Sequence, residues 1–142
     1  MIAVERVASC DPALVEAVAR LLPQLSPDRA PPDLAALEAL IADPQATLLA
    51  ARSDGAVVGM ATIAVYRKLT HVTARLEDVV VDEAARGRGV GAALVTAAIE
   101  EARRLGGREL ELTTGPWREA ANRLYPRLGF RRRETSVYLR EL

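Results

Sequence analysis

A short run of arginines and glycines, Arg86-Gly87-Arg88-Gly89-Val90-Gly91-Ala92, is the part of the sequence best suited to bind a ligand. It follows the apolar segment Val79-Val80-Val81 and precedes a stretch with helical periodicity. Glycines let backbone N–H groups approach a ligand closely, and the first amides of a helix have no intrahelical acceptor. The helix dipole and the two arginines add positive charge. We therefore predict that this loop binds an anion such as a phosphate group.

Two common nucleotide-binding patterns do not fit this loop. A Gly-x4-Gly-Lys-Ser/Thr sequence is absent, which excludes a Walker loop. The glycines at 87, 89 and 91 do not have the Gly-x-Gly-x-x-Gly spacing, and the strands before them are expected to be antiparallel, which argues against a dinucleotide-binding unit. Taken alone, the loop could also be a strand–helix corner that binds nothing.

The elements around the loop follow from hydrophobic periodicity and turn residues. Asp11 and Asp33 are expected helix N-caps, Ser53-Asp54-Gly55 a hairpin turn, and Pro23 the first of four prolines that break the chain between two helices. The expected order is a strand at 2–8, helices from 12 and 34, strands at 46–52, 56–66 and 72–81, a helix at 90–105, a strand at 108–113, a helix at 117–127, and a last strand region after Gly129. This order predicts an α+β fold.

Composition favours one ordinary domain over residues 1–142. Half of the residues are apolar, 27% are charged, and the formal net charge is zero. Apolar runs are too short for a membrane span, and the first residues lack a signal-peptide pattern. The lone Cys10 excludes an intramolecular disulfide and argues against a thiolate metal cluster. We expect a cytoplasmic protein that uses no metal.

The charge is unevenly distributed along the chain. Residues 1–85 have a balance of −5 and residues 86–142 a balance of +5. An anionic ligand would suit the basic half, and a cationic amine would suit the acidic half. Nucleic acid is not an expected partner, because aromatic residues do not alternate with the arginines.

Two motifs together resemble a known family. Arg86-x-x-Gly89-x-Gly91-Ala92, preceded by the segment Leu76–Val81, resembles the acetyl-CoA motif of the GNAT N-acetyltransferase superfamily. Ala121-x-x-Leu124-Tyr125-x-x-x-Gly129-Phe130 resembles a second signature of that superfamily. The resemblance covers residues 56–142. It implies a mixed, mostly antiparallel sheet of six to seven strands, splayed at its central strands and flanked by about four helices.

The resemblance also implies residue roles in binding acetyl-CoA as a cosubstrate. The loop amides would bind the CoA pyrophosphate, and the strand before the loop would bind the pantetheine arm. The family often has an Asn seven residues before the Tyr; this sequence has Arg118 there, and whether Arg118 or Asn122 replaces it stays open. The residues expected to bind CoA are Val79, Val80, Val81, Arg86, Gly87, Arg88, Gly89, Val90, Gly91, Ala92, Asn122 and Tyr125.

Acid and base candidates follow from the same resemblance. Tyr125 matches the tyrosine that protonates the leaving CoA thiolate in relatives. Glu77 is the first choice for the base that deprotonates the amine, followed by Asp78 and Glu111. Successive strand residues face opposite ways, so Glu77 and Asp78 could both reach the cleft only at a bulge. Alternatively, Glu77 is a structural ion-pair partner of Arg75.

The implied reaction is direct transfer of acetyl from acetyl-CoA to a primary amine. The acidic N-terminal half favours a small cationic or amino-acid-like acceptor, and a peptide or protein amine is the next choice. The expected acceptor cleft involves the N-terminal helices, the turn at 68–71 and the start of the last helix. A non-catalytic acyl-CoA sensor of the same fold is the rival hypothesis. A homodimer is a further possibility, since relatives often dimerise.

Overall fold

The computed structural model describes all residues from 1 to 142. The chain divides into two compact units, Met1–Leu112 and Thr113–Leu142, which are described separately. The first unit contains β1 (Ile2–Arg6), α1 (Pro12–Leu25), α2 (Leu34–Ala42), β2 (Ala46–Ser53), β3 (Ala56–Arg67), β4 (Val72–Val81), the 3-10 turn η1 (Glu83–Ala85), α3 (Val90–Arg104) and β5 (Glu109–Glu111). The second unit contains α4 (Glu119–Arg127).

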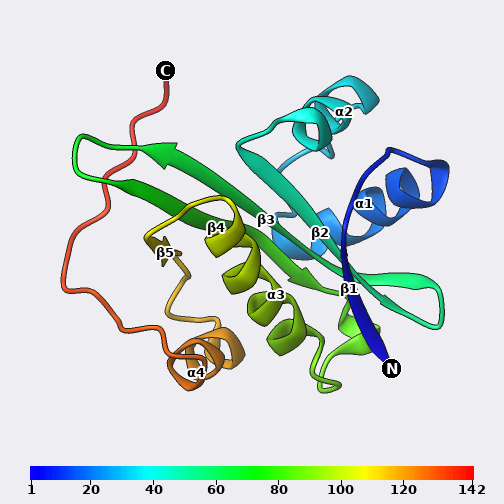
Figure 1. The fold of residues 1–142 in the computed structure, drawn as a ribbon. Coiled ribbons are helices and arrows are strands. Elements are labelled where there is room, and N and C mark those ends of the chain that lie inside the picture. The colour runs from blue at the N-terminus through cyan, green and yellow to red at the C-terminus, as the bar shows by residue number, and fades with distance from the viewer. The chain divides into compact units, whose positions relative to one another are not determined.

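The strands form one mixed sheet in the order β1-β2-β3-β4-β5 (Figure 1). The first four strands pair antiparallel, and β5 pairs parallel to β4. The single parallel pair follows from α3, which carries the chain back to the edge of β4 where β5 starts. The predicted order of antiparallel strands followed by one crossover helix is therefore confirmed.

Helices cover both faces of this sheet. On one face, apolar side chains of α1 and α2 form a buried cluster with alternate residues of β2 and β3, among them Leu48, Ala50 and Met60. The residues between them, such as Leu49 and Ala61, are equally buried on the α3 face. Burial on both faces explains why these strands are almost continuously apolar.

Capping residues set the helix and turn boundaries as the sequence predicts. The Asp11 carboxylate accepts a hydrogen bond from the Leu14 amide, and Asp33 accepts one from Ala36, both at 2.8 Å. Asp54 and Gly55 have φ values of 51° and 82°, which suit a tight hairpin turn. The expectation for Pro23 is wrong, because α1 continues through it to Leu25.

In the second unit, α4 is followed by a segment that belongs to no strand. The sheet therefore has five strands, and the predicted number of six to seven is wrong. Val137 and Leu139 alternate as in a strand, but alternation specifies only which face a strand would bury. A strand also needs the backbone of a neighbour, and residues 129–142 pair with none.

Candidate functional site

The arginine–glycine loop has the conformation that its sequence predicts. Gly87 and Gly89 have φ values of 77° and 81°, in the left-handed region that side chains disfavour. Gly89 is the N-cap of α3, and its lack of a side chain leaves the helix start uncovered. Arg86 to Gly89 are exposed, whereas Val90 is buried and anchors the first turn of α3 in the core.

The amides of this loop from Gly87 onward have no hydrogen-bond acceptor in the backbone. None of the backbone N–H groups from Gly87 to Ala92 donates to another backbone group. The N-terminus of α3 adds its partial positive charge at the same point. One side chain of the loop forms a hydrogen bond within the protein: the Arg88 guanidinium donates to the buried Ser53 hydroxyl at 2.8 Å. A guanidinium has five N–H donors, so Arg88 keeps others for a ligand.

Strand β4 contains a bulge just before the loop. The pairing with β3 shifts between Met60 and Thr62, so that Asp78 and Val79 together face a single residue of β3. Asp78 has a φ of 55°, which is unusual for a residue with a side chain. Because of the bulge, Glu77 and Asp78 are both exposed, although they are neighbours on a strand.

Beyond this bulge, β4 also loses its partner on the other side. The pairing with β5 covers only three residue pairs and ends at Arg75 and Glu111. The stretch Leu76–Val81 therefore has β3 along one edge and no strand along the other. Backbone groups on an open edge need other hydrogen-bond partners, and an extended ligand can supply them. Val79, Val80 and Val81 lie on this stretch, where Val80 is buried and its two neighbours are half-buried.

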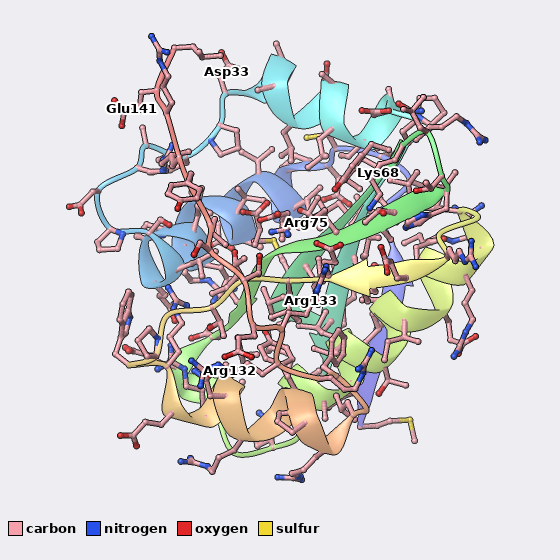
Figure 2. All side chains as sticks on the ribbon, turned by 90° about the vertical axis from the view of Figure 1, so that its left-hand side faces the viewer. Asp33, Lys68, Arg75, Arg132, Arg133 and Glu141 are labelled. Carbon is pink, nitrogen blue, oxygen red and sulfur yellow. The ribbon has the colours of Figure 1, made fainter.

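Two of the candidate bases share one arginine, Arg75, which is labelled in Figure 2, at the point where β4 and β5 part. The Arg75 guanidinium lies 3.2 Å from the Glu77 carboxylate and 3.6 Å from that of Glu111. The Glu77 side chain is 48% exposed and that of Glu111 25% exposed. Glu77 is thus the more accessible of the two, and the ion pair with Arg75 that the sequence suggested is present.

These groups lie on the same face of the sheet as α1 and α2. Arg75 and Glu77 pair with Ala64 and Thr62 of β3, which alternate in phase with Met60. Met60 packs in the cluster formed with α1 and α2. The candidate bases and the N-terminal helices therefore share one side of the sheet.

In the second unit, Tyr125 belongs to the C-terminal cap of α4. The Phe130 amide donates to the Tyr125 carbonyl at 3.1 Å, and the Gly129 amide donates to the Pro126 carbonyl at 3.2 Å. With Gly129 at a φ of 92°, these bonds form a Schellman motif. The Tyr125 and Phe130 rings meet edge to face, 5.6 Å apart. Tyr-x-x-x-Gly-Phe is thus a helix cap that fixes the tyrosine ring.

Burial raises the pKa of Tyr125 above that of a free phenol, and the charge of Arg118 opposes this only in part. The phenol is therefore neutral near pH 7 and can donate a proton. Asn122, the other candidate on α4, uses its amide within the second unit. Its Nδ2 donates to the carbonyls of Gly115 and Arg118, at 3.0 and 2.9 Å.

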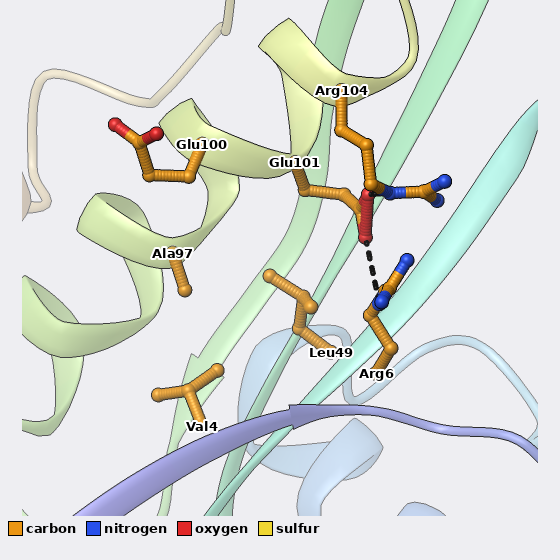
Figure 3. Close-up of a pocket in the computed structure, with 7 residues that line it drawn as sticks. All are labelled: Val4, Arg6, Leu49, Ala97, Glu100, Glu101 and Arg104. Carbon is orange, nitrogen blue, oxygen red and sulfur yellow. Dashed lines mark hydrogen bonds and ion pairs between the residues drawn. The ribbon is translucent and has the colours of Figure 1, made fainter.

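A shallow pocket of about 240 Å³ lies elsewhere, between α3 and the first two strands (Figure 3). Its buried Glu101 carboxylate forms ion pairs with Arg6, at 3.7 Å, and with Arg104. The lining residues are Val4, Arg6, Leu49, Ala97, Glu100, Glu101 and Arg104, and none was expected to bind a ligand.

No group of three or more His, Cys, Asp or Glu side chains is placed to hold a metal ion. None of the helices has the length and apolar character needed to cross a membrane.

Two residues that position the loop were missed in the sequence. A Cβ on Gly59 would lie 2.9 Å from the Leu94 side chain and 3.0 Å from the Val80 carbonyl oxygen, so this glycine lets α3 approach the sheet closely. Glycine inside a strand pattern is a signal of such close approach. Ser53, which binds Arg88, gave no signal beyond being part of an expected turn.

Comparisons with known proteins agree with this geometry. The model of the Acetyltransferase (GNAT) family matches residues 13–130. An uncharacterised N-acetyltransferase of Methanocaldococcus jannaschii is 43% identical over 61 residues, which are 43% of this chain and 27% of that protein. The match thus spans about a quarter of that relative's length.

Solved structures share the fold over nearly the whole chain. One from Agrobacterium tumefaciens, provisionally described as an acetyltransferase, is 28% identical with a TM-score of 0.84, covering 98% of this chain and 99% of its own. Another is AAC(6′)-Iy in complex with the bisubstrate analogue CoA-S-monomethyl-acetylneamine. It is 23% identical with a TM-score of 0.82, covering 100% and 99% of the two chains, and shows similarity of fold alone. The match of the family model to most of the sequence shows that this chain belongs to the GNAT acetyltransferase family.

Proposed function

We propose that this protein transfers an acetyl group from acetyl-CoA to a primary amine. The observation that supports this most strongly is the set of free amides from Gly87 to Ala92 at the start of α3, directly after a strand with an open edge. The amides suit the CoA pyrophosphate. The open edge at Val79–Val81 suits the pantetheine arm, which has amide groups of its own.

The reaction needs two proton transfers and no covalent enzyme intermediate. The neutral amine attacks the thioester carbonyl carbon, so that a C–N bond forms as the C–S bond breaks. We assign removal of the amine proton to Glu77, directly or through water, and protonation of the CoA thiolate to Tyr125. Arg75 holds one oxygen of Glu77, and the other remains available to accept a proton.

A small cationic amine is the acceptor that the charges favour. Glu77, Asp78 and Glu111 lie at the end of the β4–β5 pairing, where Arg75 forms ion pairs with Glu77 and Glu111. The analogue bound by AAC(6′)-Iy joins CoA to an acetylated amine compound, which fits an acceptor of this kind on a related fold. Peptide and protein amines are the second choice.

We further propose that residues 1–142 act as a single domain. The family match from 13 to 130 crosses the division between the two units at Leu112. Self-association stays a prediction from the sequence.

Release of free thiol from acetyl-CoA in the presence of a panel of amines tests this function. The panel should contain polyamines, aminoglycosides, amino acids and short peptides, with acetylated amines as controls that cannot accept. We expect turnover with at least one cationic amine. Binding of acetyl-CoA without turnover on any amine would favour the acyl-CoA sensor instead.

A further inference from the structure

The first residue after β4, Asp82, is held by side chains of α1. The Arg20 guanidinium forms an ion pair with one Asp82 oxygen, and Gln24 Nε2 lies 3.5 Å from the other. The Asp82 side chain is only 16% exposed. Arg20 and Gln24 come from a helix some sixty residues earlier in the chain, so these contacts are tertiary rather than local.

Asp82 in turn shapes the entrance to the arginine–glycine loop. Its carboxylate accepts a hydrogen bond from the Ala84 amide at 3.2 Å, and its carbonyl accepts one from the Ala85 amide at 2.8 Å. These bonds form the turn η1, whose C-cap is Arg86, the first residue of the loop. The direction in which the chain enters the loop therefore depends on how Asp82 is held.

Both α1 side chains also form hydrogen bonds with backbone groups, one in this turn and one in β3. Gln24 Oε1 accepts a hydrogen bond from the Glu83 amide at 2.9 Å. Arg20 donates from its second nitrogen to the Val57 carbonyl at 2.9 Å, at the start of β3. Arg20 thus connects α1, β3 and Asp82, and Gln24 connects α1 directly to η1.

We propose that Arg20 and Gln24 are positioning residues that fix the shape of the Arg86–Ala92 loop before the pyrophosphate of acetyl-CoA binds. They touch η1 and not the loop amides themselves, so their effect on the ligand is indirect. A loop that is already ordered loses less conformational freedom on binding, and its affinity is correspondingly higher. This inference rests on the proposed binding of acetyl-CoA.

The double variant Arg20→Ala/Gln24→Ala tests it. We expect the Kd and KM for acetyl-CoA to rise about tenfold, as for the loss of one hydrogen bond to a charged group. The kcat at saturating acetyl-CoA should change less than about twofold, because no reacting group is altered. In the ligand-free variant, hydrogen exchange around the loop, measured at the hydrogen-bonded amides of Ala85, Arg86 and Ala93, should be faster than in the wild type.

Glu16→Ala is the matched control. Glu16 lies on the same helix and contacts only the other side of Arg20, at 3.3 Å, so its removal should leave Kd and loop exchange unchanged. The single variant Gln24→Ala keeps the Arg20 contacts, so it still tests the proposal if the double variant does not fold. We expect a smaller rise in its Kd, with faster exchange in the same loop.

Unchanged Kd and unchanged loop exchange in the variants would overturn the proposal, provided that the wild type binds acetyl-CoA. A fall in kcat with an unchanged KM would also overturn it, because the residues would then act on chemistry. If the wild type does not bind acetyl-CoA at all, the proposed function fails instead, and the exchange measurement still reports whether α1 holds the loop.

Discussion

Tyr125 lies in a rigid helix cap, and its phenol has a raised pKa. Replacing it with Phe keeps the ring packing against Phe130 and removes only the hydroxyl. We expect Tyr125→Phe to lower kcat at least about tenfold, since general acids contribute that much or more. The Kd for acetyl-CoA should stay within about twofold, because the proton is needed only when the C–S bond breaks.

The pH dependence supplies a second check on Tyr125. Because burial raises its folded-state pKa, the acid form persists as pH rises and is lost only above the pH of about 10 at which a free phenol ionises. The wild-type kcat should therefore show no Tyr125-dependent fall below that pH. Equal kcat values for Tyr125→Phe and the wild type would remove the acid assignment.

Glu77 and Glu111 can be compared directly, because both contact Arg75. If Glu77 is the base, Glu77→Gln should lower kcat/KM at neutral pH and change the pH profile of kcat/KM. The matched variant Glu111→Gln removes the other carboxylate beside Arg75 and should keep the wild-type profile. A profile of Glu77→Gln that follows the wild type would show that water or backbone carbonyls take the proton.

Asp82, which shapes the entrance to the Arg86–Ala92 loop, should also affect the stability of the fold at low pH. Burial alone would raise its pKa, but hydrogen bonds from the Ala84 amide and Gln24, with the charge of Arg20, together lower it. A carboxyl whose folded pKa is lowered stabilises the fold fully above its unfolded pKa of about 3.9, and this stabilisation is lost as pH falls through the folded value.

Urea unfolding of wild type and Asp82→Asn between pH 7 and pH 3 measures that contribution. The wild type should be the more stable protein at pH 7, and the difference should shrink below about pH 4. Arg20→Ala with Asp82 intact serves as a control, since it should reduce the same pH-dependent difference. A difference that does not vary with pH would show that the Asp82 charge plays no part.

Among the elements, α3 depends on the close approach that Gly59 permits. A Cβ at this position would meet the Val80 carbonyl at 3.0 Å and the Leu94 and Val90 side chains. We expect Gly59→Ala to cost about 1–3 kcal/mol of unfolding free energy, as overpacking does. It should also weaken acetyl-CoA binding, because Val90 is the first residue of α3.

Gly106→Ala is the comparison for that experiment. Its φ of 85° is strained for alanine, nothing lies within 4 Å of the added Cβ, and it follows the end of α3 opposite to Val90. It should therefore lower stability without an additional loss of acetyl-CoA affinity. Equal losses of affinity in the two variants would argue that Gly59 has no specific effect on the start of α3.

The order of elements up to α4 could be predicted because each has a local signal. Asp11 and Asp33 mark helix starts, Asp54-Gly55 marks a turn, and the glycines at 87 and 89 mark the loop. The bulge at Asp78 has no such signal: a left-handed φ at an aspartate is imposed by pairing with β3, which sequence spacing does not reveal. The contacts of Arg20 with Asp82 were missed for the same reason, since they join distant segments.

At the scale of the whole molecule, the resemblance correctly predicted the family and a mixed sheet flanked by helices. It overestimated the number of strands in that sheet. The segment after Gly129 has strand-like alternation at Val137 and Leu139, yet those side chains are 74% and 86% exposed. Alternation of side chains can be seen in one segment alone, whereas a strand forms only when its backbone hydrogen-bonds to a second segment. The identity of the acceptor amine could not be predicted from local sequence patterns either, because it depends on how several segments together shape a cleft.

The central claim is that the Arg86–Ala92 loop binds the pyrophosphate of acetyl-CoA. The most direct measurement is a calorimetric titration of the wild type with acetyl-CoA and, in parallel, with S-acetylpantetheine, which has the same thioester and arm but lacks the 3′-phospho-ADP part that contains the pyrophosphate. We predict saturable binding of acetyl-CoA at micromolar to millimolar concentration and at least about tenfold weaker binding of S-acetylpantetheine. No binding of acetyl-CoA at millimolar concentration, or equal affinity for the two ligands, would contradict the claim.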